Sequence, residues 1–439
     1  MKQTKVLVVL AMSALMVFGW IGTAQNIISG GKEKQYNEYI SSAKDYMQRK
    51  LYQKAIEQYN LASEIENSQK LQSKIMKAYE LRYKESTAIY EDYLAAAEKA
   101  QSLYPKASEF ALDVAELAES QEDYKTAYKY LNNAVDAGAD DKKLMSKYCE
   151  IKYSYSFDWS EYLLAKPLAN GYYAVQTSEG WEYIDETGES ALYNKLSFAG
   201  SVSADSIVAI SAEDHIELIN SDGVVQGRID HIPDDVGMSG NNLIPVKNGD
   251  VYTYHKLIGE KAFGKYSYAG TFADNKAAVD KDGKWILIDT AGKKVSKNEY
   301  SDIKINPDGT YIKDDVMLAK EKDNYHLYNA DEKKIGDFKC DDIDIVTDDK
   351  YIAYCKDGKW GFVDKDGKTV IKPKYEKAKS FSHGLGAVYD GKKWGFINYN
   401  NKLVIDYTFI NVDYFNSKGN CMIESGNDSW QLIRLNVEQ

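Results

Sequence analysis

Side chains that could perform chemistry are few in this sequence and widely spaced. No two of its histidines stand four residues apart, the spacing at which a helix presents two imidazoles to zinc. Asp-Lys-Asp-Gly occurs at 280–283 and 364–367, but neither copy has the Glu that a calcium loop needs at its twelfth position. Both copies fit hairpin turns, where Asp-Gly is common. We therefore predict no catalytic residue, no metal site and no cofactor. The five histidines are His215, His231, His255, His326 and His383.

Cysteine usage and net charge further limit the class of protein to which the chain can belong. Cys149, Cys340, Cys355 and Cys421 are far apart and form no Cys-x-x-Cys pair, so four partly buried thiols are the simplest interpretation. A disulfide between Cys340 and Cys355 is the alternative. The net charge of −12 and the lack of a basic run argue against a nucleic-acid partner.

The first 30 residues read as a targeting segment. Val6–Ala24 carries no charge, and Lys2 and Lys5 precede it. The length favours an uncleaved single-pass anchor over a signal peptide cleaved before Gln25. Either alternative predicts an extracytoplasmic body, membrane-anchored in the first case and secreted in the second.

From 31 to 153 the apolar residues recur at helical spacing. Small residues recur with an aromatic between them, which lets paired helices approach closely. This pattern of small and aromatic residues resembles the tetratricopeptide repeat, which has paired helices and units of about 34 residues. The array is predicted to be either a spacer or a groove for a protein or peptide. The predicted packing residues are Ala43, Ala55, Tyr59, Ala62, Ala115, Ala127 and Ala134.

From 154 to 439 the pattern changes to alternation with a period of two, interrupted by Asp-Gly turns. A large apolar residue recurs every 34 to 40 positions. We interpret it as the residue that packs one three-stranded unit against the next. Gly361 and Gly395 follow it directly and predict a close approach of another part of the chain. The eight aligned positions are Trp181, Ile216, Val251, Trp285, Tyr325, Trp360, Trp394 and Trp430.

The two ends of this region complement each other. The segment from Tyr162 matches the one from Tyr375, so the array opens with the third stretch of a unit. The final unit, around Trp430, lacks that stretch. Closing the array would complete this unit and remove both exposed edges. The predicted fold is a multidomain α + β chain with an eight-bladed β-propeller closed by its N-terminal strand, and an open β-solenoid is the alternative.

The segment DGKWGFVDKDGKTVIKPKYEKAKSFSHGLGAV, which begins at Asp357, resembles the bacterial WG-repeat family. The units at Trp360 and Trp394 match best, whereas those at Trp181 and Trp285 lose the glycine after Trp. The resemblance covers about two thirds of the chain. It implies a repetitive β fold in exported or surface proteins, and no catalytic residues come with it.

Together these features predict a non-enzymatic binding or scaffold protein at the bacterial cell envelope. A module that binds cell-wall glycan is the alternative, and a hydrolase would need acid residues that converge in the propeller channel. A ligand should be held by segments that differ between units, of which His231–Asn242 and Asn306–Asp315 are the most divergent. Drift in tolerant units is the competing explanation for that divergence.

Overall fold

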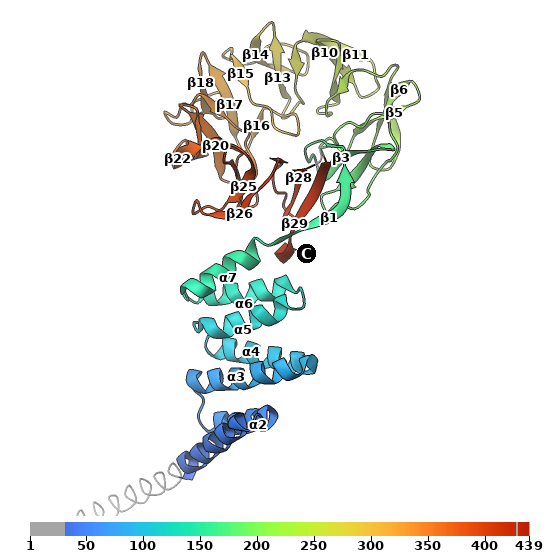
Figure 1. Ribbon diagram of the computed structural model, residues 1–439. Coiled ribbons are helices and arrows are strands. Elements are labelled where there is room, and N and C mark those ends of the chain that lie inside the picture. The colour runs from blue at the N-terminus through green and yellow to red at the C-terminus, as the bar shows by residue number, and fades with distance from the viewer. Residues whose placement is uncertain (1–30, 427–428, 439) are drawn as a thin grey trace, which may run out of the picture. The chain divides into compact units, whose positions relative to one another are not determined.

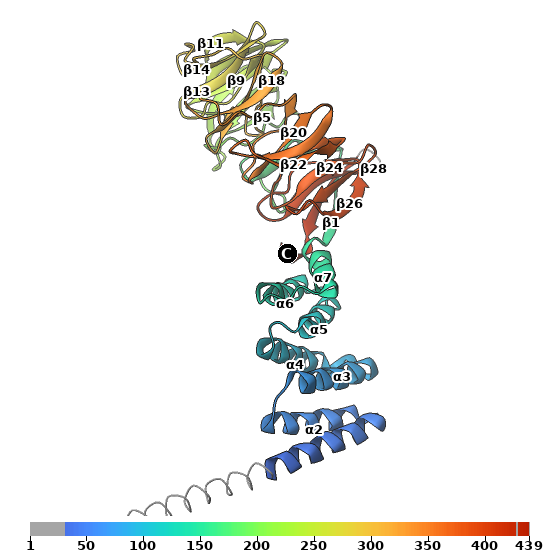
Figure 2. The same ribbon diagram turned by 90° about the vertical axis from the view of Figure 1, so that its left-hand side faces the viewer.

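The computed structural model describes residues 31–426 and 429–438. The chain divides into two compact units between Lys152 and Tyr153, and each unit is described by itself. The first unit is helical and the second consists of β-sheets (Figures 1 and 2).

The helical unit is a succession of helices in which each contacts the next. Side-chain caps satisfy free backbone N–H groups at the start of several helices, of which α3 and α6 are examples. The Ser68 hydroxyl accepts from Leu71 N at 3.3 Å, and the Asp123 carboxylate accepts from Thr126 N at 3.0 Å. The helices are residues 31–48, α2 (Tyr52–Ile65), α3 (Gln69–Glu85), the short 3-10 helix η1 (Thr87–Ile89), α4 (Tyr90–Leu103), α5 (Ser108–Glu119), α6 (Tyr124–Asp136) and α7 (Lys142–Lys152).

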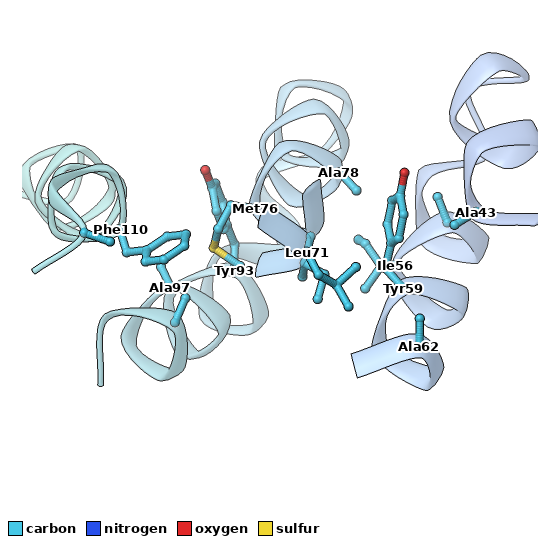
Figure 3. Packing of buried hydrophobic residues seen from close by; sticks show 14 of the residues in the cluster. Ala43, Ile56, Tyr59, Ala62, Leu71, Met76, Ala78, Tyr93, Ala97 and Phe110 are labelled. Atoms are coloured by element: carbon cyan, nitrogen blue, oxygen red, sulfur yellow. The ribbon is translucent and has the colours of Figure 1, made fainter. Parts of the chain in front are cut away.

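All seven small or aromatic residues singled out in this segment are buried. Figure 3 shows Tyr59 of α2 lying between Ala43 and Ala78, which belong to the flanking helices. Alanine at these contacts lets the helix backbones approach, and the tyrosine ring fills the space that remains.

The β unit comprises eight antiparallel sheets that follow one another around a ring (Figure 1). We number them as blades 1 to 8. The strands are β2 (Leu164–Ala165), β3 (Tyr172–Thr177) and β4 (Gly180–Asp185) in blade 1; β5 (Val208–Ala212), β6 (His215–Ile219) and β7 (Val225–Ile229) in blade 2; β8 (Asp235–Val236), β9 (Leu243–Asn248), β10 (Val251–Lys256) and β11 (Lys261–Tyr266) in blade 3; β12 (Tyr268–Ala269), β13 (Lys276–Lys281) and β14 (Lys284–Asp289) in blade 4; β15 (Asp302–Ile303), β16 (Ile312–Lys313), β17 (Val316–Glu321) and β18 (Asn324–Tyr328) in blade 5; β19 (Asp342–Ile343), β20 (Tyr351–Lys356), β21 (Lys359–Asp364) and β22 (Thr369–Tyr375) in blade 6; β23 (Lys377–Ala378), β24 (Gly386–Tyr389), β25 (Trp394–Ile397) and β26 (Leu403–Phe409) in blade 7; and β27 (Asn411–Val412), β28 (Asn420–Gly426), β29 (Ser429–Leu435) and β1 (Tyr155–Tyr162) in blade 8. A short 3-10 helix, η2 (Asn436–Glu438), follows β29.

The first strand of the unit closes the ring. Strand β1 pairs antiparallel with β29, from Tyr155 opposite Leu435 to Tyr162 opposite Trp430. Each pair of adjacent blades shares one apolar cluster, and the cluster between blades 8 and 1 joins Met422 to Tyr173. The predicted eight-bladed propeller, closed by its N-terminal strand, is confirmed, and the open solenoid is excluded.

Two-residue turns set the hairpins within the blades. Asp282 and Gly283 have φ of 56° and 77°, and Asp357 and Gly358 have φ of 52° and 74°. Positive φ at both positions gives the turn whose twist matches paired strands. The second Asp-Lys-Asp-Gly copy also lies at a turn, where the Asp364 carboxylate accepts a hydrogen bond from the backbone N–H of Lys368 at 2.8 Å.

The structure corrects the alignment of blade 3. Tyr252, not Val251, pairs with Lys247 and Tyr266, as Trp360 pairs with Cys355 and Tyr375 in blade 6. Val251 is 40% exposed. Because successive strand residues point to opposite faces, a shift of one residue moves the wrong side chain into the packed position.

The predicted membrane anchor also needs correction. In residues 31–426 and 429–438, no helix is both long and apolar enough to cross a membrane. The described helices bury one face and carry charged residues on the other. This finding contradicts the predicted single-pass, membrane-anchored localisation. The segment 1–30, with Val6–Ala24 and the predicted cleavage before Gln25, lies outside the described residues.

No disulfide joins the four cysteines, all of which belong to the described part of the chain. Cys340 lies opposite Tyr325 of blade 5, and Cys355 lies in β20 of blade 6. Both are buried free thiols, so the disulfide that the sequence allowed is not formed.

Candidate functional site

One repeated position of the propeller is charged in five of its eight blades. Directly after the short first strand of each blade, or in blade 2 after the isolated bridge of Ala199, one backbone N–H donates to a carbonyl of the next long strand. Because the same hydrogen bond recurs in every blade, the eight residues are structurally equivalent. We call this the axial position. Its occupants in blades 1 to 8 are Lys166, Gly200, Gly237, Gly270, Lys304, Asp344, Lys379 and Asp413.

A cavity of about 720 Å³ adjoins the charged side of this ring. It lies where inner loops of blades 1, 5, 6, 7 and 8 converge, which is the usual place for a propeller to hold a ligand. We call it cavity A. Its main lining segments are 167–171, 306–308, 345–350, 382–384 and 413–417.

Hydrogen bonds fix the charged groups beside cavity A. The Tyr414 hydroxyl donates to both oxygens of the Asp344 carboxylate, at 2.7 and 2.9 Å, and Ser380 N donates to it at 2.6 Å. Lys379 Nζ donates to the Val412 carbonyl at 2.6 Å. Burial raises the pKa of the Asp413 carboxyl, and the positive charge of Lys379 opposes that shift. The wall is therefore polar and held in one arrangement.

The rim of cavity A combines aromatic and charged side chains. Asp349 accepts from the Tyr399 hydroxyl at 2.7 Å and from Gly384 N at 2.8 Å. The Lys350 ammonium lies 3.8 Å from the centre of the Tyr399 ring, within the range of a cation–π contact. These contacts come from blades 6 and 7, so the rim holds the two blades together and presents a fixed surface.

A second cavity of about 350 Å³ adjoins the inner strands of blades 1 to 5, and we call it cavity B. Lys166, Asp235 and Tyr268 contribute to its wall. Asn306 and Pro307 line both cavities. Burial lowers the pKa of the Lys166 ammonium, and the Asp235 carboxylate opposes that shift.

The two divergent segments singled out from the sequence contribute to these cavities. Gly237 and Met238, from His231–Asn242, line cavity B, and residues of Asn306–Asp315 line both cavities. Differences between units therefore coincide with the cavity walls, whether or not they arose by drift.

None of the repeated tryptophans lines cavity A or cavity B; they pack between blades. Trp394 is buried, with 8% of its surface exposed, whereas Trp181, Trp285, Trp360 and Trp430 are half-buried and pack at the edges of the apolar clusters. A Cβ at Gly361 would lie 2.4 Å from the Ile371 carbonyl oxygen, and one at Gly395 would lie 2.7 Å from that of Ile405. The close approach predicted after Trp is made by the outer strand of the same blade.

Sequence reasoning missed the axial position, although a signal for it existed. The matched chain segments that begin at Tyr162 and Tyr375 place Lys166 opposite Lys379. A charged residue amid an apolar strand, repeated in register, indicates a position that faces an aqueous channel. The Tyr414 hydroxyl and the Asp344 carboxylate are 70 residues apart and come from blades 6 and 8, and no sequence pattern indicated their hydrogen bond.

The comparisons with known proteins agree with the β fold. The family model "WG containing repeat" matches residues 264–285, 360–394 and 394–427, so the second unit contains a WG-repeat β domain. No curated protein matches the chain.

Similarities to solved structures are weak. Hsv2p of Kluyveromyces lactis is 11% identical, with 53% of this chain and 91% of that chain covered and a TM-score of 0.37. A eukaryotic initiation factor is 13% identical, with 65% and 88% covered and a TM-score of 0.41. The Sgt2 TPR domain from Aspergillus fumigatus is 22% identical, with 27% and 76% covered and a TM-score of 0.22. Scores this low carry no functional argument.

Proposed function

We propose that this chain is a non-enzymatic interaction scaffold whose WG-repeat propeller holds an extended segment of a partner protein in cavity A. The observation that carries the proposal is the convergence of loops from five blades on one cavity of about 720 Å³. A cavity of this size suits a few side chains of a peptide. The fixed rim favours binding because little further ordering is needed when a ligand arrives.

A hydrolase is the second candidate, because Asp344 and Asp413 occupy the axial position of blades 6 and 8, on either side of Lys379 in blade 7. Paired carboxylates are what glycoside hydrolysis requires. However, both oxygens of Asp344 already accept the Tyr414 hydroxyl, and Ser380 N occupies one of them as well. A carboxylate engaged in this way is a weak nucleophile or base, and we therefore favour binding.

We further propose that the helical unit is a tetratricopeptide-like array. Helices α2, α4 and α6 begin at Tyr52, Tyr90 and Tyr124, which gives intervals of 38 and 34 residues. Each of them buries alanines against its neighbours. Such an array can display a second peptide-binding surface, which makes two interaction modules in one chain.

The site can be tested by placing a photo-reactive benzophenone side chain at Tyr399 in the full chain. Its matched control is the same side chain at Val224, which is 54% exposed on a turn of blade 2. Irradiation in extracts of the source cells should give a discrete adduct at Tyr399 alone, and mass spectrometry should locate one partner segment.

The envelope location rests on the family resemblance, so envelope and cytosolic extracts are compared separately. Purified cell-wall glycan is the competitor for the alternative function. Equal adducts at both positions would refute a site in cavity A. Loss of the Tyr399 adduct when glycan alone is added would favour the glycan-binding module.

A further inference from the structure

Lys166 is a half-buried ammonium on the wall of cavity B. Among the described residues it has neither an ion pair nor a side-chain hydrogen bond; its Nζ lies 5.1 Å from the centre of the Phe198 ring and 5.6 Å from that of Trp181. Removing an ammonium from water without an oxygen partner is costly. Aromatic rings offset only part of that cost.

The other lysines at the axial position show what Lys166 lacks. Each of them reaches across to the first strand of the next blade. Lys304 Nζ lies 2.9 Å from the Asp342 carboxylate, and Lys379 Nζ lies 2.6 Å from the Val412 carbonyl. The next blade after Lys166 presents the Phe198 ring instead. The sequence thus replaces an oxygen partner by an apolar ring at this one lysine.

Asp235 lies on the same cavity wall and is a negatively charged group that likewise lacks a partner among the described residues. Its repeat equivalents are bonded: Asp302 accepts from the Tyr325 hydroxyl, and Asp342 pairs with Lys304. Within the described chain, the Asp235 carboxylate has no ion pair and no side-chain hydrogen bond. Lys247 stands opposite it in the strand pair, but its Nζ lies over the Tyr252 ring, 5.7 Å from the centre.

The remaining wall combines polar groups, among them Ser201, Thr271 and Asn306, with a few apolar side chains, and the cavity has a suitable size. Met238, Pro245 and Tyr268 line it, and Tyr268 is held by ring contacts to Tyr252 and Trp285 at 5.5 and 5.2 Å. A volume of about 350 Å³ accommodates a small molecule with one side chain.

We propose that cavity B binds a free α-amino acid with an apolar side chain, whose carboxylate pairs with Lys166 and whose ammonium pairs with Asp235. Both protein charges then gain the partner that their repeat equivalents have within the chain. The apolar side chain lies against the methionine, proline and tyrosine of the wall. This site adjoins cavity A at Asn306 and Pro307, but Lys166 and Asp235 line cavity B alone, so either proposal can fail without the other.

The test is isothermal titration calorimetry of the full chain with L-leucine, L-methionine and L-phenylalanine at millimolar concentrations. At least one of them should bind. For L-leucine, isocaproate lacks the ammonium and isoamylamine lacks the carboxylate. Each analogue should bind about ten-fold or more weakly, because one charged hydrogen-bond pair is lost.

Variants locate the site. Lys166→Gln and Asp235→Asn should each weaken binding about ten-fold or more, since each removes one charge partner. Lys166→Arg keeps the charge and should retain binding. Lys304→Gln is the matched control at the same repeat position outside this cavity wall, and it should bind like the parent. Circular dichroism checks that every variant is folded.

Three results would overturn the proposal. The first is that none of the three amino acids binds. The second is that isocaproate binds as tightly as L-leucine, which would indicate a simple anion site. The third is that folded Lys166→Gln and Asp235→Asn bind like the parent.

Discussion

Ring closure through β1 should make Tyr162 as important to stability as a residue in the middle of the array. Tyr162 is 5% exposed and lies in the cluster shared by blades 8 and 1. It pairs with Trp430 as Tyr375 pairs with Trp360 in blade 6. Tyr162→Ala should therefore lower the free energy of unfolding by about 3–5 kcal/mol, the usual cost of removing a large buried aromatic ring.

Tyr375→Ala is the matched control. Tyr375 is half-buried, and its hydroxyl donates to Asn401 Oδ1 at 2.6 Å. Its removal should cost about 2–3 kcal/mol, which is no more than Tyr162→Ala. In an open array Tyr162 would stand in a terminal strand that frays, and its removal would cost under about 1 kcal/mol.

Urea unfolding of the full chain, followed by tryptophan fluorescence, measures both variants. Six of the seven tryptophans lie in the β unit, so the signal reports mainly on the propeller. A shift of the midpoint at unchanged slope gives the loss of stability. A Tyr162→Ala midpoint equal to that of the parent, beside a clear shift for Tyr375→Ala, would refute closure.

Three further predictions concern packing and titration. Trp394→Ala should cost about 3–5 kcal/mol and Trp360→Ala clearly less, because only Trp394 is buried; equal urea midpoints would contradict this ranking. Gly395→Ala should cost about 1–3 kcal/mol in the same assay, because its Cβ would lie 2.7 Å from the Ile405 carbonyl oxygen. Burial and neighbouring glutamates raise the pKa of Asp113 from 3.8 to about 7. Between these values the folded helical unit keeps a proton that the unfolded chain releases, so its stability should fall as pH rises, and Asp113→Asn should flatten that slope in unfolding monitored by circular dichroism.

Much of the fold was accessible from the sequence because packing repeats. A large apolar or aromatic residue returned in every blade, and the segment at Tyr162 supplied what the last unit lacked. The alignment of blade 3 was wrong by one residue because Val251 and its neighbour Tyr252 both favour strands. Only the pairing with Lys247 decides which of the two packs.

The cavities were harder to predict because their residues converge only in the closed ring. Lys166 and Asp235 are 69 residues apart, and neither belongs to a recognised motif. Their importance follows from a comparison with equivalent residues, which needs the hydrogen-bond register of the blades. The divergent segment Asn306–Asp315 was visible in the sequence, but its contribution to both cavities was not.

The most direct test of the central claim is hydrogen–deuterium exchange of the full chain with and without the partner segment identified by cross-linking. We expect slower exchange in the loops 345–350, 382–384 and 413–417, which line cavity A. Exchange in β7 of blade 2 should not change. Protection confined to the helical unit or to the outer strands, with these three loops unaffected, would contradict a binding site at the axis of the propeller.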